Sequence, residues 1–191
     1  MRLGIVADVH CRDGYLLDTV RLMIDEGVDE ILLAGDAHYD YNFSNEVVDI
    51  IREFKIRYVT GNHEWNLLSE HGTAARTAAH VNPRNVELVA SAPELLRTTV
   101  NGKSLLMLHG SPWAPKGQYL FTGDPLFERC DELDADYLIL GHTHVPMVQR
   151  FGRTLVINPG ALAYSEALGA LGEYAILDTS TDEVTQRKYT K

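Results

Sequence analysis

The segment Leu3-Gly4-Ile5-Val6-Ala7-Asp8-Val9-His10 sets the pattern from which the fold can be predicted. A short apolar run of this kind is typical of a buried strand. The run ends in a carboxylate and an imidazole, and ligands of open α/β sheets gather at the carboxyl ends of strands. A second apolar run, Ile31 to Ala34, ends in Gly35-Asp36 in the same way. We therefore expect two buried strands that both end in polar side chains.

Between and after these runs the sequence alternates between helical and strand patterns. Apolar residues recur at helical spacing over residues 16–24, Gly27 provides a stop, and a short helix is indicated over 47–54. A third strand is predicted over 55–60, ending at Gly61-Asn62. Strands that alternate with helices at this pace indicate a parallel βαβ layer.

The second half of the chain is richer in strands. Asn101-Gly102 lies between two β-rich runs, 95–100 and 104–108, and is a strong hairpin signal. The further strands predicted are 137–140, 145–151, 154–157, 174–178 and 184–189, with one helix over 125–133. The segment 64–84 fits no single pattern and could be helical, a mobile cap over a site, or both. The whole chain, residues 1–191, is expected to form one α/β domain of two sheets packed face to face with helices outside.

Composition excludes several classes of protein. Of the 191 residues, 45% are hydrophobic and 23% are charged, which is typical of a globular domain. Cys11 and Cys130 are too few for a disulfide framework, so a reducing, cytoplasmic location is the simple expectation. No apolar run approaches the roughly 18 residues of a membrane-spanning helix. The formal net charge of −10 disfavours a general nucleic-acid surface, but a small anionic substrate fits if its site is locally positive.

Five segments that each follow an apolar run carry oxygen and imidazole groups. They are Asp8-x-His10, Gly35-Asp36, Gly61-Asn62-His63-Glu64, His109 and Gly141-His142-x-His144. Each segment alone is weak evidence, since such short patterns also occur in ordinary turns. As an ordered set they offer the ligands that borderline divalent metals such as Mn, Fe and Zn prefer. Two such ions, roughly 3.5–4 Å apart, can stabilise both oxygens of a phosphoryl transfer.

This ordered series resembles the calcineurin-like metallophosphoesterase superfamily over Asp8 to His144, and the tail Val156 to Gly160 resembles its small bacterial and archaeal phosphodiesterase branch. The resemblance implies a four-layer α/β/β/α sandwich of two mixed β-sheets flanked by helices. It also implies hydrolysis of small phosphodiesters by attack of a metal-bridging hydroxide. The alternatives are a phosphomonoesterase acting on nucleotides or proteins, and a non-catalytic scaffold like a subunit of the retromer coat. In scaffold members the catalytic histidine is typically replaced, and the residue at that place in this chain is His63. Its presence therefore favours an enzyme over a scaffold.

The resemblance also implies a role for each residue of the series. The ligands implied for the first metal are Asp8, His10 and His144. Those implied for the second metal are Asn62, His109 and His142. Asp36 would bridge the two ions, and His63 would face the scissile phosphate without binding metal. Two divalent ions are therefore the expected cofactors, with manganese the sensible choice in vitro and iron, zinc, nickel or cobalt as alternatives.

The sequence departs from the family pattern just after Asp36. The family often has Asp or Asn three residues later, where this chain has Tyr39 with Asp40 beside it. Either Asp40 or Glu64 could therefore orient His63.

Other residues near the motifs are weaker candidates. Arg12 and His38 are candidate substrate contacts, and the alternative for Arg12 is a solvated loop residue. Trp65, Trp113 and Tyr119 could stack on a nucleoside or aryl group, or simply pack. The expected partner is a small phosphoester, with no membrane partner; a homodimer is compatible with the sequence, but no feature indicates an interface.

Overall fold

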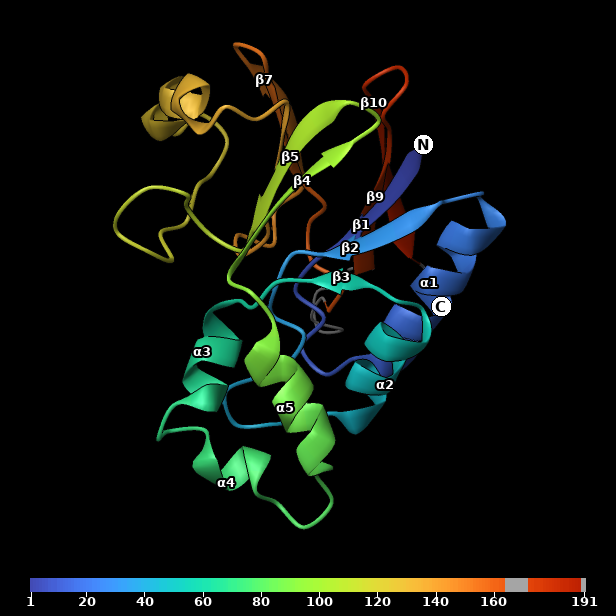
Figure 1. Cartoon of the computed structure of the whole chain (residues 1–191), viewed down its shortest axis with the longest axis vertical. Coiled ribbons are helices and arrows are strands. Elements are labelled where there is room, and N and C mark those ends of the chain that lie inside the picture. The colour runs from blue at the N-terminus through green and yellow to red at the C-terminus, as the bar shows by residue number, and fades with distance from the viewer. Residues whose placement is uncertain (164–171, 190–191) are drawn as a thin grey trace.

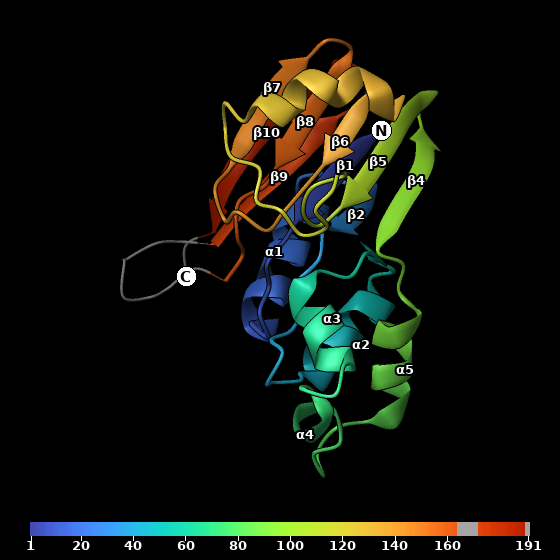
Figure 2. The same ribbon diagram turned by 90° about the vertical axis from the view of Figure 1, so that its left-hand side faces the viewer.

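The computed structural model describes residues 1–163 and 172–189, which form two five-stranded sheets stacked face to face (Figures 1 and 2). The first sheet has the order β10-β9-β1-β2-β3 and the second has the order β4-β5-β6-β8-β7. The strands of the first sheet are β1 (Arg2–Val6), β2 (Glu30–Leu33), β3 (Arg57–Tyr58), β9 (Gly172–Asp178) and β10 (Glu183–Tyr189). The strands of the second are β4 (Leu95–Val100), β5 (Lys103–Leu108), β6 (Tyr137–Ile139), β7 (Met147–Phe151) and β8 (Thr154–Asn158). Both sheets are mixed: β1, β2 and β3 are parallel, as are β5, β6 and β8, whereas β9 and β4 pair antiparallel with their neighbours.

Helices cover the outer faces of both sheets. The helices of the described residues are α1 (Asp13–Asp25), α2 (Asn45–Glu53), α3 (Asn62–Leu68), α4 (Thr73–Arg76), α5 (Pro83–Ser91) and the 3-10 helix η1 (Pro125–Leu133). Helices α1 and α2 pack on the first sheet, and η1 packs on the second. None of the helices in the described ranges is long and apolar enough to cross a membrane.

Successive side chains of a strand point to opposite faces of its sheet, which explains the layers. On β1, Leu3 and Ile5 point between the sheets, whereas Val6 points toward α1. On β5, Met107 points between the sheets and Leu106 points toward η1. Each sheet is therefore apolar on both faces, and the four-layer α/β/β/α sandwich is confirmed.

One strand differs from the sequence-based prediction, and one segment that the sequence left open is now described. Strand β3 is shorter than expected because the ladder ends at Val59, and the next N–H, of Thr60, donates to the carbonyl of Pro93 at 2.9 Å. The segment 64–84 is helical in part, since α3, α4 and the start of α5 occupy about half of it. Helix α3 begins at Asn62, so it places Asn62 and His63 in its first turn.

Candidate metal centre

The loops after the strands hold most of the expected ligands in an unusual backbone conformation. Five of them have positive φ, namely Asp8 (55°), His10 (47°), Asp36 (54°), His142 (70°) and His144 (57°). This left-handed conformation costs an L-residue roughly 1–2 kcal/mol, and such strain concentrates at functional sites. Hydrogen bonds between the loops offset it. The N–H of Asp8 donates to the carbonyl of Gly35 at 3.1 Å, and that of His10 to the carbonyl of Asp36 at 3.0 Å.

The first group of donors consists of Asp8, His10 and His144. The Nε2 atom of His144 lies 3.2 Å from Asp8 Oδ1 and 3.3 Å from His10 Nε2. Asp8 and His10 are buried, whereas 40% of the His144 side chain is exposed. Three donor atoms therefore converge on one point at the edge of the site, within 4.8 Å of one another.

The second group consists of Asp36, His109 and His142; the further expected ligand, Asn62, begins α3 next to His63, whose N–H donates to Asp36 Oδ1 at 3.0 Å. The Nε2 atom of His109 lies 3.0 Å from Asp36 Oδ2, and ligand atoms of Asp36, His109 and His142 lie within 4.8 Å of one another. His109 Nδ1 donates to the carbonyl of Ala34 at 2.7 Å, and His142 Nε2 donates to the carbonyl of Gly117 at 2.9 Å. These carbonyls fix both ring orientations, so His109 offers Nε2 and His142 offers Nδ1 as a ligand atom.

The two groups adjoin at Asp36. One set of convergent donors contains Asp36 with His109 and His142, and another contains it with His10 and His63. Burial alone would lower the pKa of His109, but the carboxylates of Asp36 and Asp8 outweigh burial and raise it to about 9. The carboxylate pair thus favours positive charge at the junction of the groups.

Three buried polar atoms at the site test whether cations fit there. Asp8 Oδ1 and Asn62 Oδ1 are buried and make no hydrogen bond, and the buried His109 Nε2 faces Asp36 Oδ2 at 3.0 Å without hydrogen-bond geometry. A buried polar atom without a partner is costly, and a coordinated cation would satisfy all three of these donors. With their mixed oxygen and imidazole chemistry, the two groups fit two borderline divalent ions, and the structure does not select among metals.

His63 stands beside the two groups on α3. Its Nδ1 donates to Asp40 Oδ1 at 2.9 Å, and its Nε2 lies 3.9 Å from Asp36 Oδ2. The side chain is 27% exposed, so it remains accessible from solvent. Of the two residues that the sequence left open as its partner, the structure gives the contact to Asp40.

Glu64 has a different place, beneath the loops. Its buried carboxylate accepts the backbone N–H groups of Asp36 (3.0 Å), His38 (2.8 Å) and Gly61 (2.8 Å). Glu64 therefore joins the loop after β2 to the start of α3 and does not reach the His63 ring.

Glycines at the strand ends make room for the ligands. A Cβ at Gly35, whose φ is +92°, would lie 2.5 Å from His109 Nδ1. A Cβ at Gly61 would overlap Asp36 Oδ1. The sequence indicated turns at these glycines, and the structure adds that any side chain there would displace a donor.

The structure separates the two candidate substrate contacts. Arg12 is exposed at the N-terminal boundary of α1, beside the loop that carries His10, and its contact with substrate stays a prediction. The His38 side chain is 0% exposed, lies 3.2 Å from the Ser44 carbonyl through Nε2 and stacks on Phe43. Because it is enclosed beneath the loop, this placement does not support the expected substrate contact of His38.

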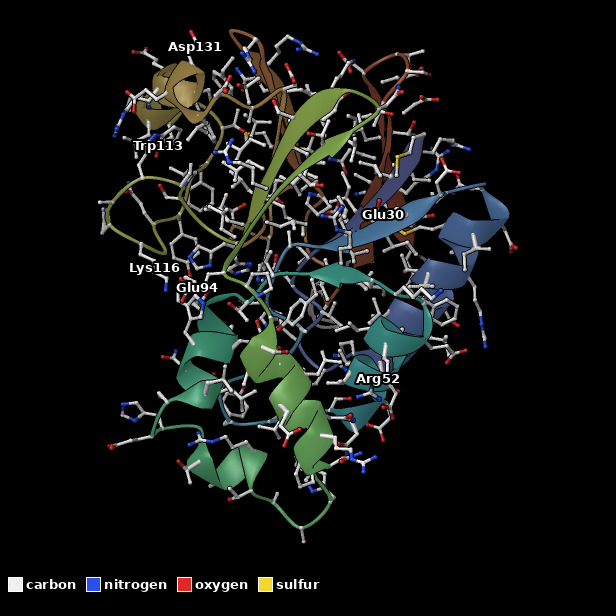
Figure 3. The ribbon with its side chains drawn as sticks, in the orientation of Figure 1. Glu30, Arg52, Glu94, Trp113, Lys116 and Asp131 are labelled. Atoms are coloured by element: carbon white, nitrogen blue, oxygen red, sulfur yellow. The ribbon has the colours of Figure 1, made fainter. Side chains whose placement is uncertain are left out.

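The three aromatic candidates also have different surroundings. Trp113 is 7% exposed and packs into the core under η1. Trp65 is covered by Lys116, whose Nζ lies 3.8 Å from the ring centroid and pairs with Glu94 (Figure 3). Tyr119 stacks directly on the His142 ring, with centroids 3.7 Å apart. Of the three, Tyr119 is the one that meets the metal groups.

Comparison with known proteins agrees with this geometry. A family model described as the calcineurin-like phosphoesterase superfamily domain matches residues 1–182. Among curated proteins, the chain is 25% identical over 178 residues to the uncharacterized protein MJ0912 of Methanocaldococcus jannaschii, covering 86% of this chain and 71% of that protein.

Solved structures show the same fold. Protein PH1004 of Pyrococcus horikoshii matches with a TM-score of 0.82 at 15% identity, covering 98% of this chain and 87% of that one. A metallophosphoesterase of Sphaerobacter thermophilus matches with a TM-score of 0.71 at 24% identity, covering 100% of this chain and 88% of that one. A structure described as a novel archaeal phosphodiesterase matches with 0.66 at 18% identity, covering 98% and 99%. With its Asp and His clusters in place, the chain belongs to the calcineurin-like phosphoesterase superfamily and is a metallophosphoesterase.

Proposed function

We propose that the protein hydrolyses small phosphodiesters at a centre of two divalent ions. The observation that carries the proposal is the adjoining of two donor groups at Asp36, with His63 held beside them by Asp40. Such ions, when bound, supply Lewis acidity to phosphoryl oxygens and acidify water. Asp8, His10 and His144 would hold one ion, Asn62, His109 and His142 the other, and Asp36 both.

The charge balance supports an anionic substrate. Two divalent ions bring four positive charges against the two negative charges of Asp8 and Asp36. The centre therefore attracts a phosphate group even though the whole chain carries −10. A long polyanion meets the acidic surface as well, so a small phosphoester is the better substrate.

His63 would act on the leaving side of the phosphate. The bond from Nδ1 to Asp40 orients the ring, and Nε2 lies on the side of the metal groups, 3.9 Å from Asp36 Oδ2. Because 27% of the side chain is exposed, the ring is accessible to a bound substrate. His63 would then neutralise charge on the phosphoryl group or protonate the departing oxygen.

The diester preference rests on the likeness to the archaeal phosphodiesterase structure, which supports it without excluding a monoester. Both kinds of substrate would present non-bridging phosphoryl oxygens to the metal ions. The residues around the metal centre must therefore discriminate between a diester and a monoester. A phosphomonoesterase is the alternative within the superfamily, and a non-catalytic scaffold is the alternative outside enzymes.

Metal-stripped protein, reloaded with Mn, would be assayed on bis(p-nitrophenyl) phosphate and p-nitrophenyl phosphate between pH 6 and 9. We expect Mn to restore turnover, with the larger kcat/KM on the diester. His63→Asn and Asp40→Asn should both lower kcat, and His63→Asn should lower it more. The exposed His80, in the segment before α5, provides the matched control His80→Asn. A larger kcat/KM on the monoester would select the monoesterase, and absence of turnover on both would favour the scaffold.

A further inference from the structure

Two stacks of aromatic rings lead outward from the metal centre. In the first stack, Tyr39 lies on His10 with ring centroids 4.5 Å apart, and Tyr41 lies on Tyr39 at 5.3 Å and an interplanar angle of 9°. In the second stack, Tyr119 lies on His142 at 3.7 Å, and Phe121 lies near-parallel to Tyr119 at 6.1 Å and 8°. Each stack therefore begins on an imidazole of the candidate centre and ends on a ring outside it.

The stacks belong to different halves of the centre and of the fold. His10 is a member of the first donor group, and its stack comes from the loop between β2 and α2. His142 is a member of the second group, and its stack comes from the segment between β5 and η1. One aromatic surface is thus available next to each of the two groups.

Three of the four Tyr and Phe rings in the two stacks are exposed to solvent. Tyr41 is 74% exposed, Tyr119 53% and Phe121 50%. Trp113, from the same segment as Tyr119 and Phe121, is 7% exposed and fills the core under η1. Large aromatic rings are normally at least partly buried, and a gathering of exposed apolar side chains often marks a binding site.

Backbone hydrogen bonds hold both loops in shape. The N–H of Cys11 donates to the carbonyl of Ala37 at 2.9 Å, which fixes the loop of the first stack against the His10 loop. The N–H of Ser111 donates to the carbonyl of Gln118 at 3.1 Å, which closes the second loop just before Tyr119. The rings are therefore presented by braced turns, which lowers the entropy lost when a ligand binds.

Resting on the function proposed above, we propose that the two stacks are the subsites for the two ester groups of the substrate. The substrate is then a phosphodiester that carries a planar aromatic ring, aryl or nucleobase, on each side of the phosphate. With the phosphate at the metal centre, one ring seats on the Tyr39–Tyr41 stack and the other on the Tyr119–Phe121 stack. Parallel rings offer flat faces, and stacking on them tolerates different ring types.

The test uses two diesters with the same leaving group, bis(p-nitrophenyl) phosphate with two rings and methyl p-nitrophenyl phosphate with one. The variants are Tyr41→Leu and Phe121→Leu, which remove the outer ring and keep an apolar side chain. Both diesters lose a p-nitrophenyl ring, so the variant of the stack that binds this departing ring should have a higher KM for both. The other stack should raise KM for the two-ring diester more than for the methyl diester, by roughly two- to ten-fold.

Calorimetric titration gives a second readout that does not depend on turnover. The Mn-loaded wild type should bind diphenyl phosphate more tightly than dimethyl phosphate, and each variant should narrow that difference. Ile24→Ala, on α1 and 49% exposed, is the control for loss of an exposed apolar side chain. It should leave KM for both diesters at the wild-type value.

The outcomes separate this inference from the function on which it rests. If the wild type hydrolyses both diesters but neither variant changes the KM of the two-ring diester, the aromatic subsites are wrong and the phosphodiesterase stands. If both variants raise KM equally for the two diesters, the assignment of one ring to each stack is also wrong. If the Mn-loaded wild type hydrolyses neither diester, the proposed function itself fails.

Discussion

The two donor groups have similar ligands but different surroundings. In the second group, the carbonyls of Ala34 and Gly117 hold the rings of His109 and His142. In the first group, His10 Nδ1 is buried without a hydrogen-bond partner in the described part of the chain, and 40% of the His144 side chain is exposed. The second group is therefore oriented by the fold, whereas the first depends more on the ion itself.

This difference teaches where metal affinity should reside. A ligand whose second nitrogen is hydrogen-bonded keeps its orientation and binds metal more tightly, and loss of such a partner typically costs about 10–100-fold in affinity. We expect the second group to bind one ion tightly and the first to exchange its ion with solvent. Asp36, which adjoins both, should couple the two.

Asp36→Asn should have the largest effect because it removes the shared carboxylate. We expect kcat/KM to fall by more than about 100-fold, because loss of a residue that only hydrogen-bonds to a metal ligand typically costs about 10–100-fold. Asn tolerates the left-handed backbone at this position, so the fold should survive. Elemental analysis should show loss of both ions, and circular dichroism should remain that of the wild type. Loss of a single ion would show that Asp36 serves one group alone.

A matched pair, His109→Asn and His144→Asn, compares the groups directly. In the His144 variant only the exchangeable ion is weakened, so activity should fall about 10-fold or more at micromolar Mn and return at millimolar Mn. In the His109 variant the oriented group itself is broken, so added Mn should not restore activity. Equal recovery of the two variants would mean that the groups do not differ.

Metal removal should occur in two steps. Brief treatment with a dilute chelator should take the ion of the first group, whose His144 is open to solvent, and leave about one ion for each chain. Activity should be lost in this step, because the reaction proposed here needs both ions. Timed samples, measured by elemental analysis beside the diester assay, would check this. Release of both ions in one phase would contradict the comparison.

The smallest expected effect is a pH dependence of stability in the metal-stripped protein. The pKa of His109 there is about 9, above its ordinary value of about 6.5, since Asp36 and Asp8 outweigh its burial. Its stabilising contribution is therefore complete below about pH 6.5 and declines as the pH rises through 9. Urea unfolding at pH 6, 7.5 and 9 should show this decline, and His109→Asn should flatten it. The control His80→Asn should show the same decline in stability as the wild type. A decline of the same size in His109→Asn would mean that other groups cause it.

The sequence predicted the layers well because their cause is local. The continuous apolar runs Leu3 to Ala7 and Leu105 to Leu108 already indicate strands that are buried on both faces, as between a second sheet and a layer of helices. The same runs pointed to polar residues at the strand ends, and the structure brings six of the seven expected ligands, all but Asn62, into convergent groups. The short length of β3 was not predictable, because it depends on Pro93, 33 residues from Thr60 along the chain.

The surroundings of the donors were beyond the reach of sequence reasoning. Which nitrogen of His109 is free depends on the carbonyl of Ala34, 75 residues away, and no pattern in either segment announces that contact. His38 was expected to border the substrate because it follows Asp36 by two residues. The loop instead turns it inward, onto the Ser44 carbonyl and Phe43. Tyr41 and Phe121 were missed because nothing but their exposure distinguishes them from core aromatics.

The left-handed backbone at five ligands has a consequence for anyone who would transplant this centre. Copying the seven side chains onto another sandwich would not rebuild it, because ordinary loops do not hold five non-glycine residues at φ between 47° and 70°. The graft would need the mutual bonds between the loops after β1 and β2, and the carboxylate of Glu64 beneath them. The N–H of His142 donates to Asp8 Oδ2 at 3.1 Å, so the loop after β6 belongs to the same unit. The smallest transferable unit is therefore a set of interlocked strand-end loops rather than a list of ligands.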